Sequence, residues 1–294
     1  MQTLHVYRWA MCAVALGLAA VPTSALAQAG TDIYLVDIAR EGGVRFGSPI
    51  NTTNRAGYDN QPSFTPDGKA VLYTSVRDGQ ADIWRYDIAA RSNRAVTTTP
   101  ESEYSATVMP SGRTFSAIRV EMDSTQRLWQ FDLSGGDPKV VYENVMPVGY
   151  HAWIDANTTA MFILGRPATL QIGDIRTGVA ETAASNIGRS IHKAVDKEAT
   201  IFLHRMSESE AWITEWDVGA SKMRHLVAPV GDGQDFVVMS NGTIIMGDGS
   251  KLFAWREDSG EWLEVADFTG RIADITRLAG SPDADRIAIV GSDP

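Results

Sequence analysis

A recurring alternation of short apolar runs and polar turns organises the chain between residues 31 and 294. The clearest unit contains the turn Thr65-Pro66-Asp67-Gly68, the apolar run Ala70–Tyr73, a second turn at Arg77-Asp78-Gly79 and the run Ile83–Tyr86. Asp-Gly supplies the positive φ angles of a tight hairpin, and β-branched and aromatic residues favour strands. This unit therefore predicts three consecutive antiparallel strands.

The same turn recurs five more times. Its central positions are 67, 111, 156, 197, 241 and 283, and an apolar run follows each turn: Phe115–Val120, Ala160–Leu164, Thr200–Leu203, Ile244–Met246 and Ile287–Val290. Short strands at this period, with no helical stretch, predict an all-β chain folded as a six-bladed β-propeller. The third strands carry apolar groups on both faces, as at Ile83 and Trp84, so we expect each sheet and most tryptophans to pack between neighbouring blades.

The two ends of the repeat region complement each other. The chain stops after the second strand of the sixth unit, whereas Thr31–Asp37 has the pattern of a third strand and Val44–Ile50 could supply a fourth. We therefore expect the N-terminal strands to complete the last blade, which removes two open sheet edges. An open β-solenoid of the same period is the alternative, although it would not need a split unit.

The first 27 residues have the pattern of a targeting segment. Arg8 is the only charge before Asp32, Trp9–Val21 is apolar, and Ala25-Leu26-Ala27 is a small-residue cleavage site. This pattern predicts a signal peptide over residues 1–27, a propeller over 31–294 and a periplasmic or secreted protein. An uncleaved anchor is the alternative, but the apolar run is too short for the roughly 20 residues of a membrane span. We expect no stable membrane insertion after cleavage.

Charge, cysteine content and motif searches exclude several function classes. The formal net charge is −10, with 36 acidic and 26 basic residues, so a nucleic-acid partner is not expected. The single cysteine, Cys12, lies in the predicted signal peptide ahead of most of the apolar run, and we do not expect it to be lipidated. The mature chain would then have no thiol nucleophile. Gly-x-Ser-x-Gly, His-Glu-x-x-His and P-loop motifs are also absent from the sequence.

One stretch resembles a known repeat. Gln61–Gly68, followed by Arg77-Asp78-Gly79 and Ile83–Asp87, is similar to the WD40-like repeat of TolB-like propellers. The resemblance implies a six-bladed propeller, and we expect a member that consists of the propeller alone. TolB itself carries an α/β domain before its propeller, so a role in the Tol–Pal system does not carry over.

Superimposing the six units identifies residues that should line the central channel. Equivalents of Gln61 are Ser105, Tyr150, Ile191, Asp235 and Arg277, whereas equivalents of Pro62 include His151 and His192. First strands surround the channel of a propeller, so their starts should meet at one mouth. Matching histidines on adjacent blades could share a divalent metal with Gln61 or Asp235, or act as acid and base. They could equally be polar lining residues bonded to water and backbone.

Two functional hypotheses follow. The first is a non-enzymatic scaffold, without a cofactor, that binds a protein or peptide partner in the cell envelope through the mouth residues Tyr58, Gln61, Tyr104, Tyr150, Asp235 and Arg277. Tyrosines at three successive blade starts suit contact with a peptide or a glycan. The alternative is a channel-mouth enzyme of the carbohydrate lyase or lactonase type that uses His151 and His192, with or without a channel metal.

Overall fold

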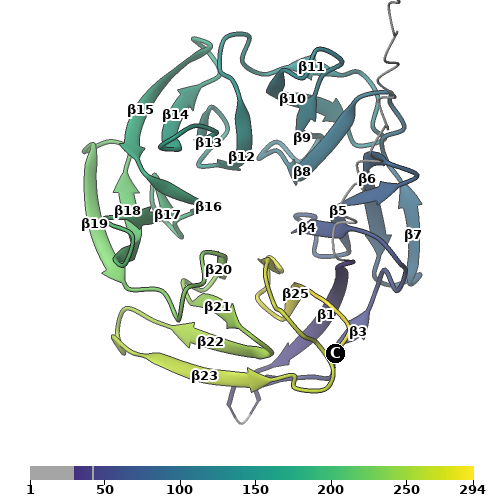
Figure 1. Ribbon diagram of the computed structural model, residues 1–294, viewed down its shortest axis with the longest axis vertical. Coiled ribbons are helices and arrows are strands. Elements are labelled where there is room, and N and C mark those ends of the chain that lie inside the picture. The colour runs from purple at the N-terminus through teal and green to yellow at the C-terminus, as the bar shows by residue number, and fades with distance from the viewer. Residues whose placement is uncertain (1–29, 42) are drawn as a thin grey trace, which may run out of the picture.

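The computed structural model describes residues 30–41 and 43–294, which form six antiparallel sheets arranged as a ring (Figure 1). Each sheet is one blade, and its first strand lies nearest the central axis. The prediction of an all-β, six-bladed propeller is confirmed, and the described residues contain no α-helix. Consequently, this part of the chain also holds no helix with the length and apolar character of a bilayer span. The predicted signal peptide over residues 1–27 lies outside the described residues.

Blades 1 to 3 follow one another along the chain. Blade 1 comprises β4 (Asp59–Phe64), β5 (Ala70–Arg77), β6 (Gln80–Asp87) and β7 (Ser92–Ala95). Blade 2 comprises β8 (Ser102–Val108), β9 (Thr114–Val120), β10 (Gln126–Asp132) and β11 (Lys139–Val140). Blade 3 comprises β12 (Val148–Trp153), β13 (Thr158–Ile163), β14 (Thr169–Asp174) and β15 (Val179–Ser185).

The remaining blades complete the ring. Blade 4 comprises β16 (Ile187–Lys193), β17 (Ala199–Arg205), β18 (Ala211–Asp217) and β19 (Lys222–Val227). Blade 5 comprises β20 (Phe236–Val238), β21 (Ile244–Asp248), β22 (Lys251–Trp255) and β23 (Trp262–Asp267). Blade 6 comprises β24 (Leu278–Gly280), β25 (Arg286–Gly291), β1 (Asp32–Ala39), β2 (Arg45–Phe46) and β3 (Ile50–Asn51).

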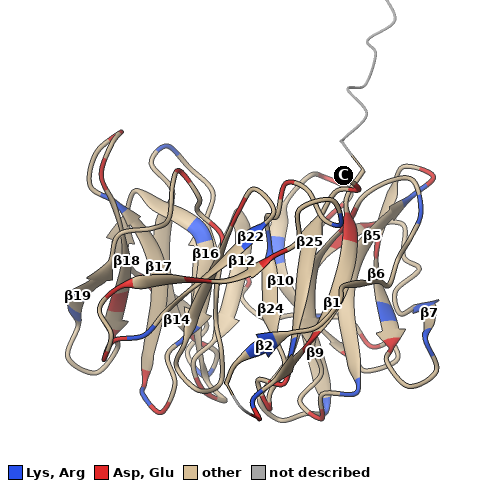
Figure 2. Cartoon of the chain, turned by 90° about the horizontal axis from the view of Figure 1, so that it is seen from below, with Lys and Arg blue, Asp and Glu red and all other residues tan. Residues whose placement is uncertain are grey.

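The repeated turns lie between the first and second strands of every blade. In blade 1 the Asp67 carboxylate accepts hydrogen bonds from the Thr65 hydroxyl at 2.7 Å and the Lys69 amide at 3.1 Å. Gly68 follows at a φ of 66°, a left-handed conformation that glycine adopts without a Cβ clash. This turn reverses the chain between the end of β4 and the start of β5. Figure 2 shows the ring from the side, with strands that run between turns at its two ends.

The core is divided into six apolar clusters, one at each interface between adjacent blades. Blade 1 illustrates the arrangement, because Ile83 packs toward blade 2 whereas Tyr86 and Trp84 pack toward blade 6. Both faces of one sheet are therefore buried, as the apolar third strands predicted. A blade lacking either neighbour would expose one apolar face to water.

Strand β1 closes the ring, which confirms the expected N-terminal contribution to the last blade. It pairs with β25 in antiparallel register from Asp32 opposite Gly291 to Asp37 opposite Arg286. Its side chains alternate between two interfaces: Ile33 and Leu35 pack toward blade 1, whereas Tyr34, Val36 and Ile38 pack toward blade 5. Both β2 and β3 pair with the outer edge of β1, so the predicted fourth strand is split in two.

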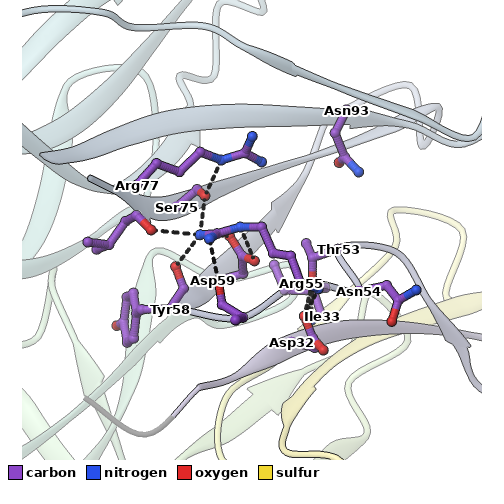
Figure 3. Close-up of polar contacts among 12 residues, drawn as sticks. Asp32, Ile33, Thr53, Asn54, Arg55, Tyr58, Asp59, Ser75, Arg77 and Asn93 are labelled. Carbon is purple, nitrogen blue, oxygen red and sulfur yellow. Dashed lines mark hydrogen bonds and ion pairs between the residues drawn. The ribbon is translucent and has the colours of Figure 1, made fainter. Parts of the chain in front are cut away.

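A polar network joins this closure to blade 1 (Figure 3). Asp32 accepts hydrogen bonds from the Thr53 hydroxyl at 2.7 Å and from Asn51 at 2.8 Å. The neighbouring Arg55 guanidinium donates to the Ser75 hydroxyl at 2.8 Å and contacts both carboxylate oxygens of Asp59, at 3.1 and 3.0 Å. Asp59 is fully buried, and that burial raises its pKa while Ser75 and Arg55 oppose the rise. Arg55 is thus the charge that makes a buried Asp59 carboxylate tolerable.

We predict that Asp59→Asn lowers the free energy of unfolding by about 2–3 kcal/mol, because it leaves the Arg55 guanidinium without its carboxylate partner. Urea denaturation at pH 7 measures the loss. Asp78→Asn is the matched control, since Asp78 is exposed in the following turn and should change stability by less than about 0.5 kcal/mol. Equal stability of the two variants would contradict the assignment.

Candidate functional site

The central channel contains a cavity of about 730 Å³ that is lined by the first strands of all six blades. Six of the predicted site residues line it, and they come from five different blades: Gln61, Tyr150, His151, His192, Asp235 and Arg277. Tyr58 and Tyr104 are absent from the cavity wall. Tyr104 packs against the apolar cluster between blades 2 and 3. Only Tyr150 of the predicted tyrosine ring therefore reaches the wall.

Gln61 ties two first strands together. Its side-chain oxygen accepts hydrogen bonds from the Thr74 hydroxyl at 2.8 Å and from the Ser105 backbone amide of blade 2 at 2.9 Å. Gln61 and its equivalent Ser105 both have positive φ angles, 57° and 54°, at irregularities in the strand register. The side-chain oxygen of Gln61, which the metal hypothesis requires as a ligand, therefore already accepts two hydrogen bonds from the protein.

Asp235 is held by a residue that the repeat alignment did not identify. Arg189 donates from Nε to Asp235 Oδ1 at 2.9 Å and from Nη2 to Oδ2, so both carboxylate oxygens are engaged. The Asp235 carboxylate raises the pKa of Arg189. Arg189 lies within the irregularity between Ile187 and Ile191 in β16. A β-bulge changes the direction in which a side chain points. A strictly periodic alignment of the repeats has no position for the extra residue of a bulge.

Arg277 and Tyr150 meet across the channel. They belong to the starts of blades 6 and 3, which are opposite in the ring, and Arg277 Cζ lies 4.3 Å from the centroid of the Tyr150 ring. Tyr58 belongs to the same electrostatic group: burial raises its pKa to about 12, and the charges of Arg277 and Arg189 partly oppose this. The mouth of the channel is therefore crossed by a cation–π contact.

The two histidines do not form the shared site that was predicted. Trp153 is the last paired residue of β12, and Lys193 is the last paired residue of β16. Two residues before these ends stand His151 in β12 and Ile191 in β16, so His151 is equivalent to Ile191. His192 is one residue further along, so the prediction of matching positions is wrong by one. Successive side chains of a strand point to opposite faces. The one-residue slip therefore turns His151 toward blade 2 and His192 toward blade 5, away from each other.

Each histidine is engaged at a separate blade interface. The Nε2 atom of His151 lies 2.7 Å from the Ser116 hydroxyl of blade 2, and Trp153 donates to the same hydroxyl at 2.9 Å. His192 lies 3.1 Å from the Ser190 hydroxyl and its ring centroid is 5.0 Å from that of Phe236 in blade 5. Burial lowers the pKa of both histidines to about 4, so both are neutral at pH 7.

The predicted donor set does not fit a divalent metal. Gln61 and Asp235 have their oxygens occupied by protein donors, and the histidines contact serines of separate interfaces. Across residues 30–41 and 43–294, no three His, Cys, Asp or Glu side chains are grouped as metal ligands. The channel mouth is therefore rich in hydrogen-bond donors and does not form a set of metal ligands.

Comparison with known proteins identifies the fold. No protein-family profile matches the chain. The uncharacterized protein Atu1656 of Agrobacterium fabrum is 25% identical over 119 residues, which cover 38% of this chain and 39% of that protein. The matched segment thus spans less than half the length of this curated relative.

Solved structures match over most of the ring. A candidate TolB from Agrobacterium tumefaciens superposes with a TM-score of 0.72 at 16% identity, covering 91% of this chain and 99% of that one. TolB from Acinetobacter baumannii gives 0.59 at 15% identity, covering 90% and 64%. An oligogalacturonate lyase in complex with manganese gives 0.56 at 14% identity, covering 88% and 85%. The fold of this chain is the TolB-like six-bladed β-propeller.

Proposed function

We propose that this protein is a non-enzymatic scaffold that holds a protein or peptide partner at the channel mouth, in the periplasm or after secretion. The N-terminal pattern of residues 1–27 supports export. A propeller supports many functions through its loops, so the proposal depends on the side chains at the mouth.

The observation that carries the proposal is a set of exposed apolar side chains on the face that contains the mouth. We call them the apolar collar: Met122, Met146, Leu164 and Met206, whose exposed fractions are 77%, 44%, 42% and 49%. They belong to loops of three consecutive blades, 2 to 4. Tyr150 stands at the start of blade 3, in the middle of this arc.

Strand direction places the collar at the mouth end of the ring. The first strand of each blade starts at the mouth, and the second strand returns to it, as the pairing of Ser102 with Val120 shows in blade 2. Loops that follow the second strands, including that of Met122, therefore lie on the mouth face. The loops of Met146 and Leu164 adjoin, since the Leu164 amide donates to the Pro147 carbonyl at 2.9 Å.

The chemistry of the collar suits a protein surface. Methionine is flexible and polarisable, and it adapts to varied apolar partners. Methionine, tyrosine and arginine are also enriched at protein interfaces. A partner that covers the collar would remove apolar surface from water and reach Tyr150 and Arg277 at the centre.

The histidines support the scaffold over the lyase or lactonase alternative. A general acid or base works best with a pKa near the operating pH, whereas burial lowers the pKa of His151 and His192 to about 4. The contact of His151 with Ser116 joins β12 to β9 of the neighbouring blade, and His192 contacts Ser190 of its own strand and the Phe236 ring of blade 5. We assign both to packing of the channel wall.

We predict that a photo-crosslinking residue at Met122 forms adducts with a partner in the native envelope fraction. The same residue at Leu133, which is exposed in blade 2 on the opposite face, is the matched control and should give at least fivefold fewer adducts. Gel separation and mass spectrometry measure both. Equal yields at the two positions, or no adduct at Met122, would refute a partner at the mouth face.

We also predict that stability falls as the pH drops from about 6.5 toward 4. The folded state keeps His151 neutral and the unfolded chain does not, so protons bind the unfolded state preferentially in this window. His151→Gln should remove on the order of 2–3 kcal/mol of this pH dependence and leave the crosslinking at Met122 intact. Urea denaturation at several pH values decides, and an unchanged profile for His151→Gln would contradict the assignment.

A further inference from the structure

The guanidinium of Arg277 is the exception among four arginines that face buried or channel positions near the mouth, since Arg119 is buried and ion-paired with Glu103. Arg55 contacts Asp59, and Arg189 contacts both oxygens of Asp235. Arg277 makes no side-chain hydrogen bond or ion pair within the part of the chain that the structure describes, and its one specific contact is the Tyr150 ring. Its five donors therefore remain available at the channel mouth.

The stacking on Tyr150 fixes where those donors lie. A guanidinium over a tyrosine face is held by the ring quadrupole without using its N–H groups. Because Arg277 and Tyr150 start opposite blades, the contact holds the positive charge across the opening of the channel. A ligand that enters the channel from the mouth face must pass this charge.

Hydroxyl groups at the starts of other first strands add further donors without protein acceptors. The Tyr58 and Tyr150 hydroxyls make no hydrogen bond to any described residue, and the Ser105 hydroxyl is buried on the cavity wall without a partner. Burial raises the pKa of Tyr58 to about 12, so its phenol keeps its proton at neutral pH. The carboxylate beside them, Asp235, is already saturated by Arg189.

We propose that the mouth recognises a carboxylate on the bound peptide segment, with Arg277 as its ion-pair partner and the hydroxyls of Tyr58, Tyr150 and Ser105 as additional donors. This proposal rests on the proposed function, since it names the chemistry of the partner at the same mouth. A planar guanidinium fork matches the two oxygens of a carboxylate. The overall charge of −10 opposes an acidic ligand only weakly, because physiological salt screens charges beyond about 8 Å.

Calorimetric titration of the intact protein at about 0.15 M salt tests the proposal with three probes of equal length. They are acetyl-Gly-Gly-Glu-Gly-Gly-amide, its Gln counterpart and acetyl-pentaglycine with a free C-terminus. We expect at least one carboxylate probe to bind about tenfold more tightly than the Gln probe, as one charged hydrogen-bonded contact would give. Tighter binding of the Glu probe assigns a side chain as the source, and tighter binding of the free acid assigns a chain end.

Variants connect the preference to Arg277. Arg277→Gln should abolish the tenfold preference, Arg277→Lys should keep part of it, and Tyr150→Phe should reduce it about threefold by removing one donor. Arg271→Gln is the control, because Arg271 is exposed and bonds Ser48 at the outer rim of the ring. A preference that survives in Arg277→Gln would overturn the proposal.

The remaining outcomes separate this inference from the proposed function. Recognition of a carboxylate is refuted if the Gln probe binds as tightly as the carboxylate probes, or if no probe binds up to about 5 mM. If crosslinked adducts at Met122 persist in that case, the proposed scaffold function still holds. Loss of those adducts would refute both. Tighter binding of a galacturonate trisaccharide than of every peptide would assign the mouth to an acidic sugar and overturn the peptide assignment.

Discussion

A sheet with two apolar faces cannot be stable alone, and this constraint governs the whole molecule. Each blade buries its faces only against the blades beside it, so the row of blades must close on itself. Closure depends on β1, which is far from β25 in sequence and pairs with it along six residues. Five of its apolar side chains are buried, and each contributes roughly 2 kcal/mol by leaving water.

The same closure produces the site. When six first strands converge on one axis, their starts bring residues from distant parts of the sequence to one opening, as Tyr150 and Arg277 show. Irregularities in these strands decide which side chains enter it, since Arg189 and Gln61 both lie where the ladder is interrupted. The outer blade strands then serve mainly to pack the ring, which leaves the mouth free to vary. Function in this fold is therefore carried by short segments on a rigid frame.

The architecture could be predicted from the sequence because it depends on the repeat period and on the alternation of apolar and polar segments. A change at a single residue does not alter either pattern. The turn around Asp67-Gly68 and the two-faced strand around Ile83 each identify one blade, and the pattern of Thr31–Asp37 identifies the closure. Which side chains reach the site depends on the strand register to within one residue, and the repeat period of the sequence does not determine the register that precisely. His151 and His192 were therefore placed together although they lie at separate interfaces, and Arg189 was missed because it lies in a bulge.

Some of the missed residues carried a detectable signal. Asp59 and Glu103 stand at equivalent positions, two residues before Gln61 and Ser105, and both are fully buried against an arginine. Extending the superposition of the units by two residues would have aligned these acids. Their partners Arg55 and Arg119 come from different strands or loops, so the pairing itself requires the three-dimensional fold. Likewise, no sequence period reveals that Arg277 reaches across to Tyr150.

Native-state hydrogen exchange is the most direct test of the closed ring. The amides of β1 that pair with β25 should exchange only through global unfolding, as slowly as those of β5 and β9, because the strand is shared by two interfaces. Peptide-resolved mass spectrometry at neutral pH compares these strands within one sample. Exchange of β1 that is orders of magnitude faster than that of β5 would show that the last blade opens independently, and would contradict the account of a ring held by its N-terminal strand.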